Sequence, residues 1–270
     1  MTTELVYDHF VKYFPHAPAA LCVKECARLA ALRDYRLAGP ILDVGCGDGL
    51  FAKIAFDGAE VWGIDIDAKE GRWAQASRAY SQIVLGDITK AKLPAGFFGS
   101  CVANCSLEHV PDLQAALATI AGSLQPGADA ILFVPNKVWA SKFMTVRAVR
   151  ATFGDRIAKL LQDGIDEFFA HRHLHDEQGW RDEIEKSPLR LKEIRPVLST
   201  STTLAFEALL IPSLAGYLNK KLTSRWTNFP GARQVAAPIV YAFVKGVLAA
   251  AGDQEMTAEY LIVAQRKDNG

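Results

Sequence analysis

The chain has 270 residues, half of them apolar, which is enough to bury the core of one large α/β domain or of a domain with an added cap. Lysine plus arginine equals aspartate plus glutamate at 30 each, so the basic excess of a typical nucleic-acid binder is missing and we expect no nucleic-acid partner. The five scattered cysteines argue against a secreted disulfide framework and favour a cytoplasmic location.

An aromatic segment and an amphipathic helix come before the first predicted strand. Tyr7 and His9 belong to the aromatic segment, and residues 19–34 place apolar side chains at helical spacing. We assign residues 1–38 to an N-terminal helical lid. Tyr7 and His9 either close over a bound cofactor or simply pack within this lid, and packing is the simpler interpretation.

Strands and helices alternate between residues 39 and 136. The predicted strands are continuous apolar runs rather than alternating ones. This pattern is typical of a parallel sheet that is covered by helices on both faces. Strands are predicted at 41–44, 61–64, 82–85, 100–104 and 130–134, and helices at 50–56, 68–79 and 111–124.

The alternation ends after residue 136. Residues 137–189 are predicted to form a substrate lid insertion followed by a helix at 176–187. Residues 190–270 are predicted to supply the last two strands, at 191–198 and 258–265. Between those strands lies a strongly apolar helical insertion at about 200–256.

A glycine turn follows the first strand and opens the first helix. Asp43 precedes Gly45, Gly47 and Gly49, and glycines allow a positive φ and a close approach of ligand to backbone. Asp65 ends the second strand, where a carboxylate can accept both hydroxyls of a ribose. These features fit nicotinamide dinucleotides and S-adenosylmethionine alike.

Three details favour S-adenosylmethionine. The spacing is G-x-G-x-G rather than G-x-G-x-x-G, and the Asp43 carboxylate suits a cationic methionine end better than a pyrophosphate. Asp87 ends the third strand and can accept the exocyclic amine of adenine. For Asp87 taken alone, a role as a helix N-cap is an equally good interpretation.

Six motifs in the correct order make residues 40–136 resemble the class I S-adenosylmethionine-dependent methyltransferases, in particular the type 11 group. They are ILDVGCGDG (41–49), GIDID (63–67), GDI (86–88), NCSLEHVPD (104–112), LQPG (124–127) and VPN (134–136). The resemblance implies a doubly wound, Rossmann-like α/β fold with seven mostly parallel strands and helical cap insertions. It implies S-adenosylmethionine as cofactor and S-adenosylhomocysteine as product.

The resemblance also implies roles for individual residues. The methionine end of the cofactor would lie on the turn, the ribose and adenine at the ends of the second and third strands, and the sulfonium at the end of the fourth. The corresponding residues are Asp43, Gly45, Cys46 and Gly47 for the turn, Asp65 and Ile66 for ribose and adenine, Asp87 and Ile88 for adenine, and Asn104 and Ser106 for the sulfonium. One departure is the long link before the last strand, which is a short hairpin in many family members.

Histidines are the candidates for a general base. His109 follows the fourth strand and is the first candidate, although it could equally orient a neighbouring helix. His171, His173 and His175 alternate, so on a strand they would share one face and could bind a metal. No fourth ligand is evident, and we therefore expect no metal and a lid segment that turns one histidine, His173, to the substrate.

The apolar insertion at 200–256 has three interpretations. It forms a buried cap or homodimer surface, it lines a pocket for a hydrophobic acceptor, or it lies on a membrane surface with Lys220, Lys221, Arg225 and Arg233 toward the headgroups. The third interpretation implies peripheral contact with the inner face of a membrane.

We predict a methyltransferase that acts on a small-molecule acceptor, hydrophobic or linked to a lipid or glycan, by O-methylation. A NAD-linked oxidoreductase on the same fold and a non-catalytic cofactor-binding protein are the alternatives.

Overall fold

The computed structural model describes residues 5–223, 225–250 and 256–267. Residues 224 and 251–255 of the expected apolar insertion lie outside the described residues. The chain divides into two compact units. The sheet unit contains residues 35–137, 166–196 and 259–270, and the helical unit contains residues 1–34, 138–165 and 197–258.

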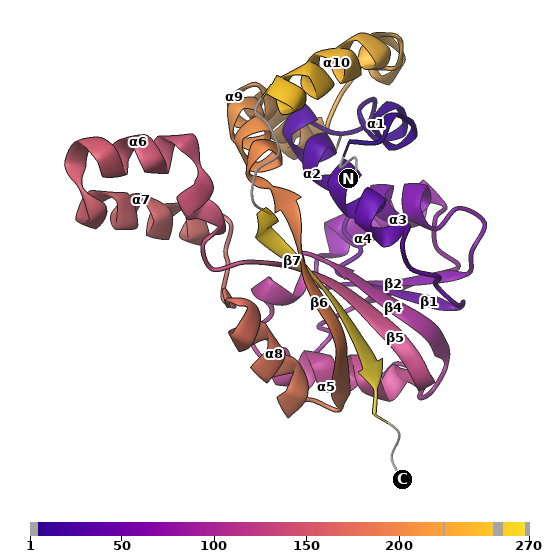
Figure 1. Ribbon diagram of the computed structural model, residues 1–270. Coiled ribbons are helices and arrows are strands. Elements are labelled where there is room, and N and C mark those ends of the chain that lie inside the picture. Colours follow the sequence, from indigo (N-terminus) through magenta and orange to yellow (C-terminus); the bar gives the residue numbers. More distant parts are fainter. Residues whose placement is uncertain (1–4, 224, 251–255, 268–270) are drawn as a thin grey trace. The chain divides into compact units, whose positions relative to one another are not determined.

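The sheet unit is built on seven strands in the order β3-β2-β1-β4-β5-β7-β6 (Figure 1). The pairs among β1 to β5 are parallel, and β7 runs antiparallel to β5. The predicted α/β fold with a mostly parallel seven-stranded sheet is therefore confirmed. The strands are Ile41–Val44 (β1), Val61–Asp65 (β2), Gln82–Leu85 (β3), Phe98–Asn104 (β4), Leu124–Pro135 (β5), Leu189–Ser199 (β6) and Met256–Arg266 (β7).

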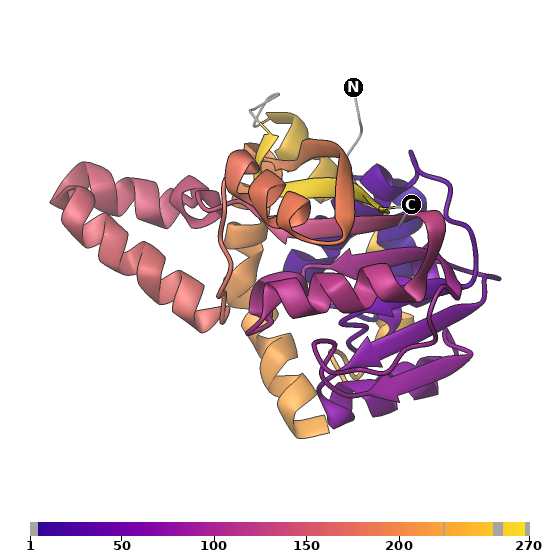
Figure 2. The same ribbon diagram turned by 90° about the horizontal axis from the view of Figure 1, so that it is seen from below.

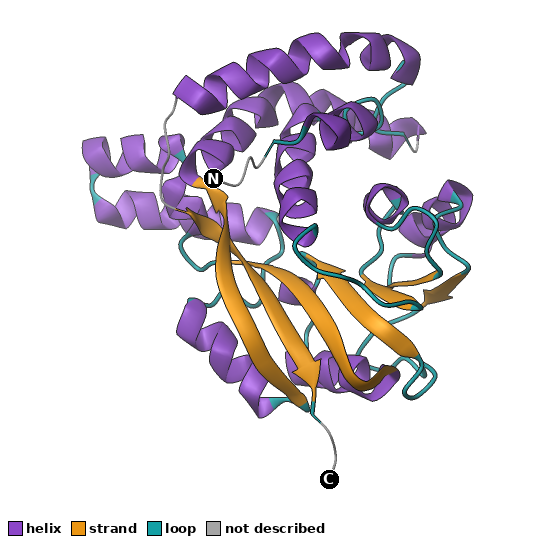
Figure 3. Ribbon diagram, turned by 45° about the vertical axis from the view of Figure 1, so that its right-hand side comes forward, coloured by secondary structure: helices purple, strands orange, loops and turns teal. Residues whose placement is uncertain are grey.

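Helices cover both faces of this sheet. The chain moves from β1 to β2 and β3 in one direction and from β4 to β5 in the other, so right-handed crossovers place their helices on opposite faces. Helices lie on both sides of the strands in Figure 3. The helices that follow these strands in the chain are Leu50–Ala55 (α3), Ala68–Ser77 (α4), Leu113–Ser123 (α5) and Glu177–Lys186 (α8), which Figure 1 labels.

Strand β5 begins six residues earlier than the sequence predicts. The predicted helix stop at residues 125–127 lies inside this strand, because Leu124 already pairs with Phe98 of β4. Gly127 accommodates the change with a φ of 72°, and the register of the two strands shifts between Phe98 and Ser100. The first residues of β5 therefore form an irregular start to the strand, which the Gln-Pro-Gly signal does not prevent.

The helical unit gathers three segments that are far apart in sequence. Helix α2 packs against α9, and α1 packs against α10. Helices α6 and α7 form an antiparallel hairpin (Figures 1 and 2). The elements are Tyr7–Tyr13 (α1), Ala19–Leu32 (α2), Trp139–Lys142 (η2), Met144–Phe153 (α6), Asp155–Phe168 (α7, whose last residues belong to the sheet unit), Thr200–Thr223 (α9) and Pro230–Ala250 (α10).

The aromatic N-terminal helix α1 packs inside the helical unit. Phe10 is fully buried and stacks on Phe14, with 5.3 Å between ring centroids. Tyr241 of α10 meets Tyr7 edge-on at 5.0 Å. His9 is also buried. These contacts favour the interpretation that Tyr7 and His9 are packing residues.

We expect His9 to make the fold sensitive to acid. Burial, assisted by the charge of Arg33, lowers the pKa of His9 from 6.5 to about 4. The unfolded chain then binds the proton more readily, so the His9 contribution to stability is complete above pH 6.5 and falls as the pH drops toward 4. The thermal midpoint should fall more steeply over this range for the wild type than for His9→Gln. Carboxylates titrate in both proteins, so equal slopes would refute the role of His9.

Candidate active site

A cavity of about 280 Å³ lies at the carboxyl ends of β1, β2, β3 and β4. This is the edge of an open parallel sheet where ligands bind, next to the β1–β4 pair at which the strand order reverses. The cavity is lined by Val44, Gly45, Ile64, Asp65, Ile66, Gly86, Asp87, Ile88, Cys105, Ser106, His109, Val110 and Pro111.

Most of the predicted cofactor residues line this cavity. They are Gly45, Asp65, Ile66, Asp87, Ile88 and Ser106, and the candidate base His109 lies there as well. The predicted residues that do not line it are Asp43, Cys46, Gly47, Asn104 and His173. Val44 and Ile64 also line the cavity, although neither was predicted as a site residue. Each is the last apolar residue of its strand, and this position at the strand end could have identified it as a lining residue.

Two backbone N–H groups fix the Asp65 carboxylate. Gly47 N donates to Oδ2 at 2.8 Å, and Asp67 N donates to Oδ1 at 2.9 Å. An ionised carboxylate offers about four acceptor positions, so two further donors can still bind. The side chain therefore fits the pair of neighbouring hydroxyls of a ribose.

The glycine turn touches the end of β4 directly. Gly45 has a φ of 74°, and a Cβ atom on it would lie 2.3 Å from the Cβ of Ser106. Ser106 Oγ donates to the carbonyl of Val44 at 2.6 Å. The Ser106 side chain thus joins the ends of β1 and β4, because it packs against Gly45 and donates to the Val44 carbonyl.

Asp43 supports the turn from within the protein. Its side chain is buried and accepts a hydrogen bond of 2.7 Å from Tyr80 Oη, which lies 3.3 Å from the Cys46 carbonyl. Burial, followed by the charge of Asp43, raises the pKa of the Tyr80 phenol and of the Cys46 thiol. Both groups are therefore neutral structural elements. No local sequence pattern pointed to Tyr80.

Asp87 closes a turn at the end of β3. Thr89 donates to its Oδ1 through the backbone N–H at 2.9 Å and the hydroxyl at 2.8 Å, and these hydrogen bonds lower the pKa of Asp87. A turn rather than a helix follows, so the helix N-cap interpretation is wrong. Beside it, Ile66 is 73% exposed and Ile88 is buried, which gives the cavity an apolar wall.

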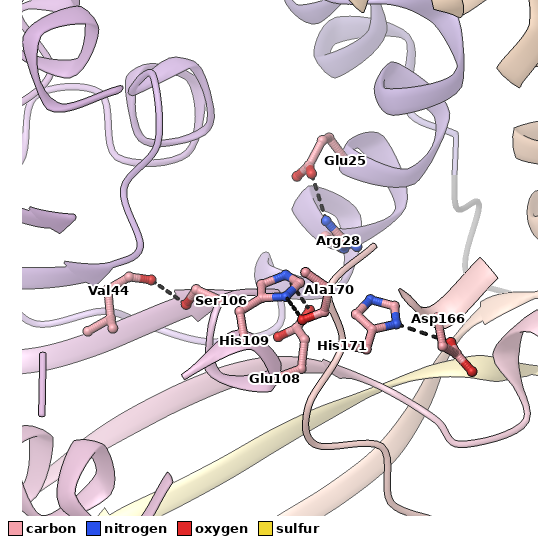
Figure 4. Close-up of polar contacts among 9 residues, drawn as sticks. All are labelled: Glu25, Arg28, Val44, Ser106, Glu108, His109, Asp166, Ala170 and His171. Atoms are coloured by element: carbon pink, nitrogen blue, oxygen red, sulfur yellow. Dashed lines mark hydrogen bonds and ion pairs between the residues drawn. The ribbon is translucent and has the colours of Figure 1, made fainter. Parts of the chain in front are cut away.

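His109 belongs to the short helix Leu107–His109 (η1) and its ring is held in a defined orientation (Figure 4). Nδ1 lies 3.1 Å from the carbonyl oxygen of Ala170 and Nε2 lies 3.7 Å from Oε1 of the buried Glu108. A carbonyl only accepts, so Nδ1 carries the proton in the neutral ring and Nε2 carries the lone pair.

The segment that carries the histidine trio runs along η1. The carbonyl of Glu108 accepts from the N–H groups of Arg172 at 2.8 Å and His173 at 3.1 Å. His173 Nε2 lies 2.9 Å from the carbonyl of Val110. His171 stacks on His109 with 5.5 Å between ring centroids. The trio therefore does not present three rings to one ligand, and His109 is the histidine that lines the cavity.

The structure groups Glu108, His109 and His171 instead, and their possible ligand atoms lie within 4.8 Å of one another. The expectation of no metal stays a prediction.

Comparison with known proteins agrees with this geometry. Residues 42–132 match the family model described as a methyltransferase domain. An uncharacterized methyltransferase of Mycobacterium tuberculosis is 41% identical over 90 residues, which are 32% of this chain and 46% of the relative. A ubiquinone biosynthesis O-methyltransferase of Alkalilimnicola ehrlichii is 35% identical over 157 residues, which are 50% of this chain and 63% of the relative. The chain thus spans about half the length of the curated relatives it matches.

The fold is shared with a solved methyltransferase. The crystal structure of geranyl diphosphate C-methyltransferase from Streptomyces coelicolor, in complex with Mg²⁺, geranyl-S-thiolodiphosphate and S-adenosyl-L-homocysteine, superposes with a TM-score of 0.56. The two chains are 16% identical, and the alignment covers 92% of this chain and 78% of the other.

Residues 42–132 therefore match a methyltransferase domain, in agreement with the six motifs that resemble the type 11 group.

Two glycines of the turn provide a test of the close contact between Gly45 and Ser106. Gly45→Ala adds a methyl group that collides with Ser106, whereas Gly47→Ala, at a φ of 52°, meets no atom within 4 Å. We expect Gly47→Ala to cost about 1 to 2 kcal/mol of stability from the left-handed backbone alone. Gly45→Ala should cost about 1 to 3 kcal/mol more from overpacking. Chemical denaturation measures both, and equal losses would refute the close contact.

Proposed function

We propose that this chain is a methyltransferase that transfers the methyl group of S-adenosylmethionine to an oxygen of a small, apolar acceptor. The observation that carries the proposal is the Asp65 carboxylate, fixed by two backbone N–H groups at the cavity beside the Gly45 turn. Both residues lie within the matched methyltransferase domain. The cavity suits adenosine, and the family match favours a sulfonium cofactor over a dinucleotide.

When bound, S-adenosylmethionine supplies a methyl group on a positively charged sulfur; an acceptor oxygen displaces that sulfur, and S-adenosylhomocysteine remains. The residues of the chain bind the cofactor and orient it. Asp65 accepts the ribose hydroxyls, Asp87 accepts the adenine amine, and Ile66 and Ile88 pack against the ring. We assign the methionine end to Asp43, Gly45, Cys46 and Gly47, and the sulfonium side to Asn104 and Ser106.

His109 is the proposed general base. Its Nε2 lone pair can take the proton of the acceptor hydroxyl while Nδ1–H stays on the Ala170 carbonyl. The Glu108 carboxylate, 3.7 Å from Nε2, would stabilise the imidazolium that forms. His173 is a weaker candidate because its Nε2 already meets the Val110 carbonyl. We propose that His173 positions the segment against which His109 rests.

The acceptor is proposed to be apolar. Val110 and Pro111 follow His109 in the chain and line the same cavity, and apolar walls of this kind favour hydrophobic ligands. The relative from Alkalilimnicola is an O-methyltransferase, which supports oxygen as the atom methylated. The solved neighbour acts on geranyl diphosphate at carbon, so a prenyl-type acceptor with carbon methylation is the second candidate.

The place of action is proposed to be the cytoplasm, in peripheral contact with the inner face of a membrane or as a homodimer through residues 200–256. Two helices of this segment, α9 and α10, are long and apolar enough by composition to cross a membrane. An enzyme that draws an apolar acceptor from a lipid phase would benefit from such a contact.

Asp65→Asn tests the cofactor site. The amide keeps the shape but loses the charge, and charged hydrogen bonds contribute about 1.5 to 3 kcal/mol, so S-adenosylhomocysteine affinity should fall about 10- to 100-fold in calorimetric titration. Asp67→Asn is the matched control, because asparagine preserves the helix cap that Asp67 provides to Lys69 and Glu70. No binding by the wild type would refute the cofactor assignment, and equal affinity of Asp65→Asn would refute the ribose role.

His109→Gln tests the base. We expect the methyl-transfer rate to fall about 100- to 10,000-fold, the usual contribution of general base catalysis, with most of the S-adenosylhomocysteine affinity retained. The assay measures S-adenosylhomocysteine formation with phenolic acceptors that carry alkyl chains of increasing length. His173→Gln is the comparison and should lose much less. A larger loss in His173→Gln than in His109→Gln would exchange the two roles.

A further inference from the structure

Helices α9 and α10 are apolar, yet the protein leaves them largely uncovered. Only 28% of the apolar stretch of α9 and 11% of that of α10 is buried. A core helix of this composition would be mostly buried. An exposed apolar surface of this size indicates that something else covers it.

Helix α10 has two distinct faces. The inner face is formed by Ala237 and Val244, which are buried, and by Tyr241, whose ring meets Phe10 of α1 at 5.7 Å. The outer face is formed by Val235, Ile239, Phe243 and Val247, which repeat every four residues and are 80%, 76%, 68% and 45% exposed. Residues two apart in sequence are separated by about 200° around a helix. Ile239 is two residues from both Ala237 and Tyr241, so it points away from the inner face.

The inner face prevents α10 from crossing a bilayer in this fold. Arg233 donates through Nε to the carbonyl of Phe14 at 2.9 Å and through Nη2 to that of Ala17 at 2.6 Å. Its guanidinium also lies 3.9 Å from the Phe14 ring centroid. These contacts tie one side of α10 to protein along the helical unit (Figure 1). A helix with one bound face and one apolar face is suited to the plane of a membrane interface.

The net charge of residues 200–250 indicates which kind of partner surface they bind. Residues 200–250 contain five cationic side chains and one acid, a net charge of +4 in a chain whose formal net charge is zero. The cations are Lys220, Lys221, Arg225, Arg233 and Lys245. The acid, Glu207, accepts from the N–H groups of Met144 and Thr145 on α6. In a symmetric dimer through this surface the same positive segments would face each other, whereas an anionic lipid surface attracts them.

Two amide side chains connect α9 to the residues just before α10. Asn219 Nδ2 donates to the carbonyl of Arg225 at 2.6 Å, and Asn228 Nδ2 donates to Asn219 Oδ1 at 2.8 Å. This pairing presents Phe229, which is 74% exposed, and the Trp226 ring, over which Lys220 Nζ lies at 4.3 Å. Aromatic rings next to cations are typical of the headgroup region of a bilayer.

We propose that the outer face of α10 and residues 225–229 bind an anionic lipid surface, with Ile239 and Phe243 in the acyl boundary and Lys220, Lys221 and Arg225 at the headgroups, while Arg233 stays on the carbonyls of the helical unit. This proposal depends on the proposed function only for the reason that membrane binding would be useful, namely to bring the enzyme to an apolar acceptor. The binding itself requires neither cofactor nor acceptor.

Vesicle flotation tests the proposal. The full chain is mixed with vesicles of phosphatidylcholine plus phosphatidylglycerol, or of phosphatidylcholine alone, and the bound fraction is measured after density-gradient centrifugation. We expect binding to the anionic vesicles that weakens with added salt. Ile239→Glu/Phe243→Glu should lower the partition constant at least about tenfold, because two apolar side chains no longer enter the lipid.

Phe153→Glu/Leu160→Glu is the matched control. It places the same two charges on the α6–α7 hairpin, at residues that are 67% and 62% exposed, and should bind like the wild type. All four positions are exposed, so both variants should keep the wild-type circular dichroism spectrum. Equal binding by all three proteins, or no binding by the wild type, would overturn the proposal. A dimer in sedimentation that only Ile239→Glu/Phe243→Glu abolishes, without vesicle binding, would assign the face to a second copy. Calorimetry with S-adenosylhomocysteine tests the proposed function separately.

Discussion

The contact between Gly45 and Ser106 determines how closely β1 and β4 approach at the edge of the sheet. A methyl group on Gly45 would overlap Ser106, and the Ser106 hydroxyl is bonded to the Val44 carbonyl. The Gly47 N–H extends this link to Asp65 at the end of β2. Two hydrogen bonds and the packing of the Ser106 side chain against Gly45 therefore join three strand ends. The cavity, its carboxylate and the base candidate all take their positions from this junction.

Main-chain hydrogen bonds hold the histidine segment against η1. The carbonyl of Glu108 accepts two N–H groups from the histidine segment, and the carbonyl of Ala170 in that segment accepts from His109. The ring orientation of His109 is consequently set by main-chain atoms about 60 residues away in sequence. Preorganisation of this kind fixes one tautomer before any substrate arrives, which is what a proton acceptor requires.

The sheet and the cofactor side could be predicted because their signals are local. Apolar runs, the glycine spacing and acids at strand ends all lie within a few residues of the features they produce. Tyr80 beneath Asp43 and the stacking of His171 on His109 could not be predicted, since only the fold brings these residues together. The irregular start of β5 was missed because pairing with β4 outweighed a local turn signal.

The apolar insertion was visible in composition, but its faces were not. Hydrophobicity alone does not distinguish a core helix from an interfacial one, and only the packing of Tyr241 and the exposure of Ile239 separate the two sides of α10. Likewise, the three segments that form the helical unit share no sequence signature that would assign them to one unit.

The segregation of charge has a consequence for how the protein would approach a surface. The chain as a whole is neutral, so the +4 of residues 200–250 is balanced by −4 elsewhere. A molecule with zero net charge has no long-range electrostatic attraction to an anionic layer. Its positive segment is attracted only within a Debye length of that layer, about 8 Å at physiological salt. It would orient at short range, attach through few side chains and detach readily, so that each molecule alternates between water and the bilayer instead of residing at either.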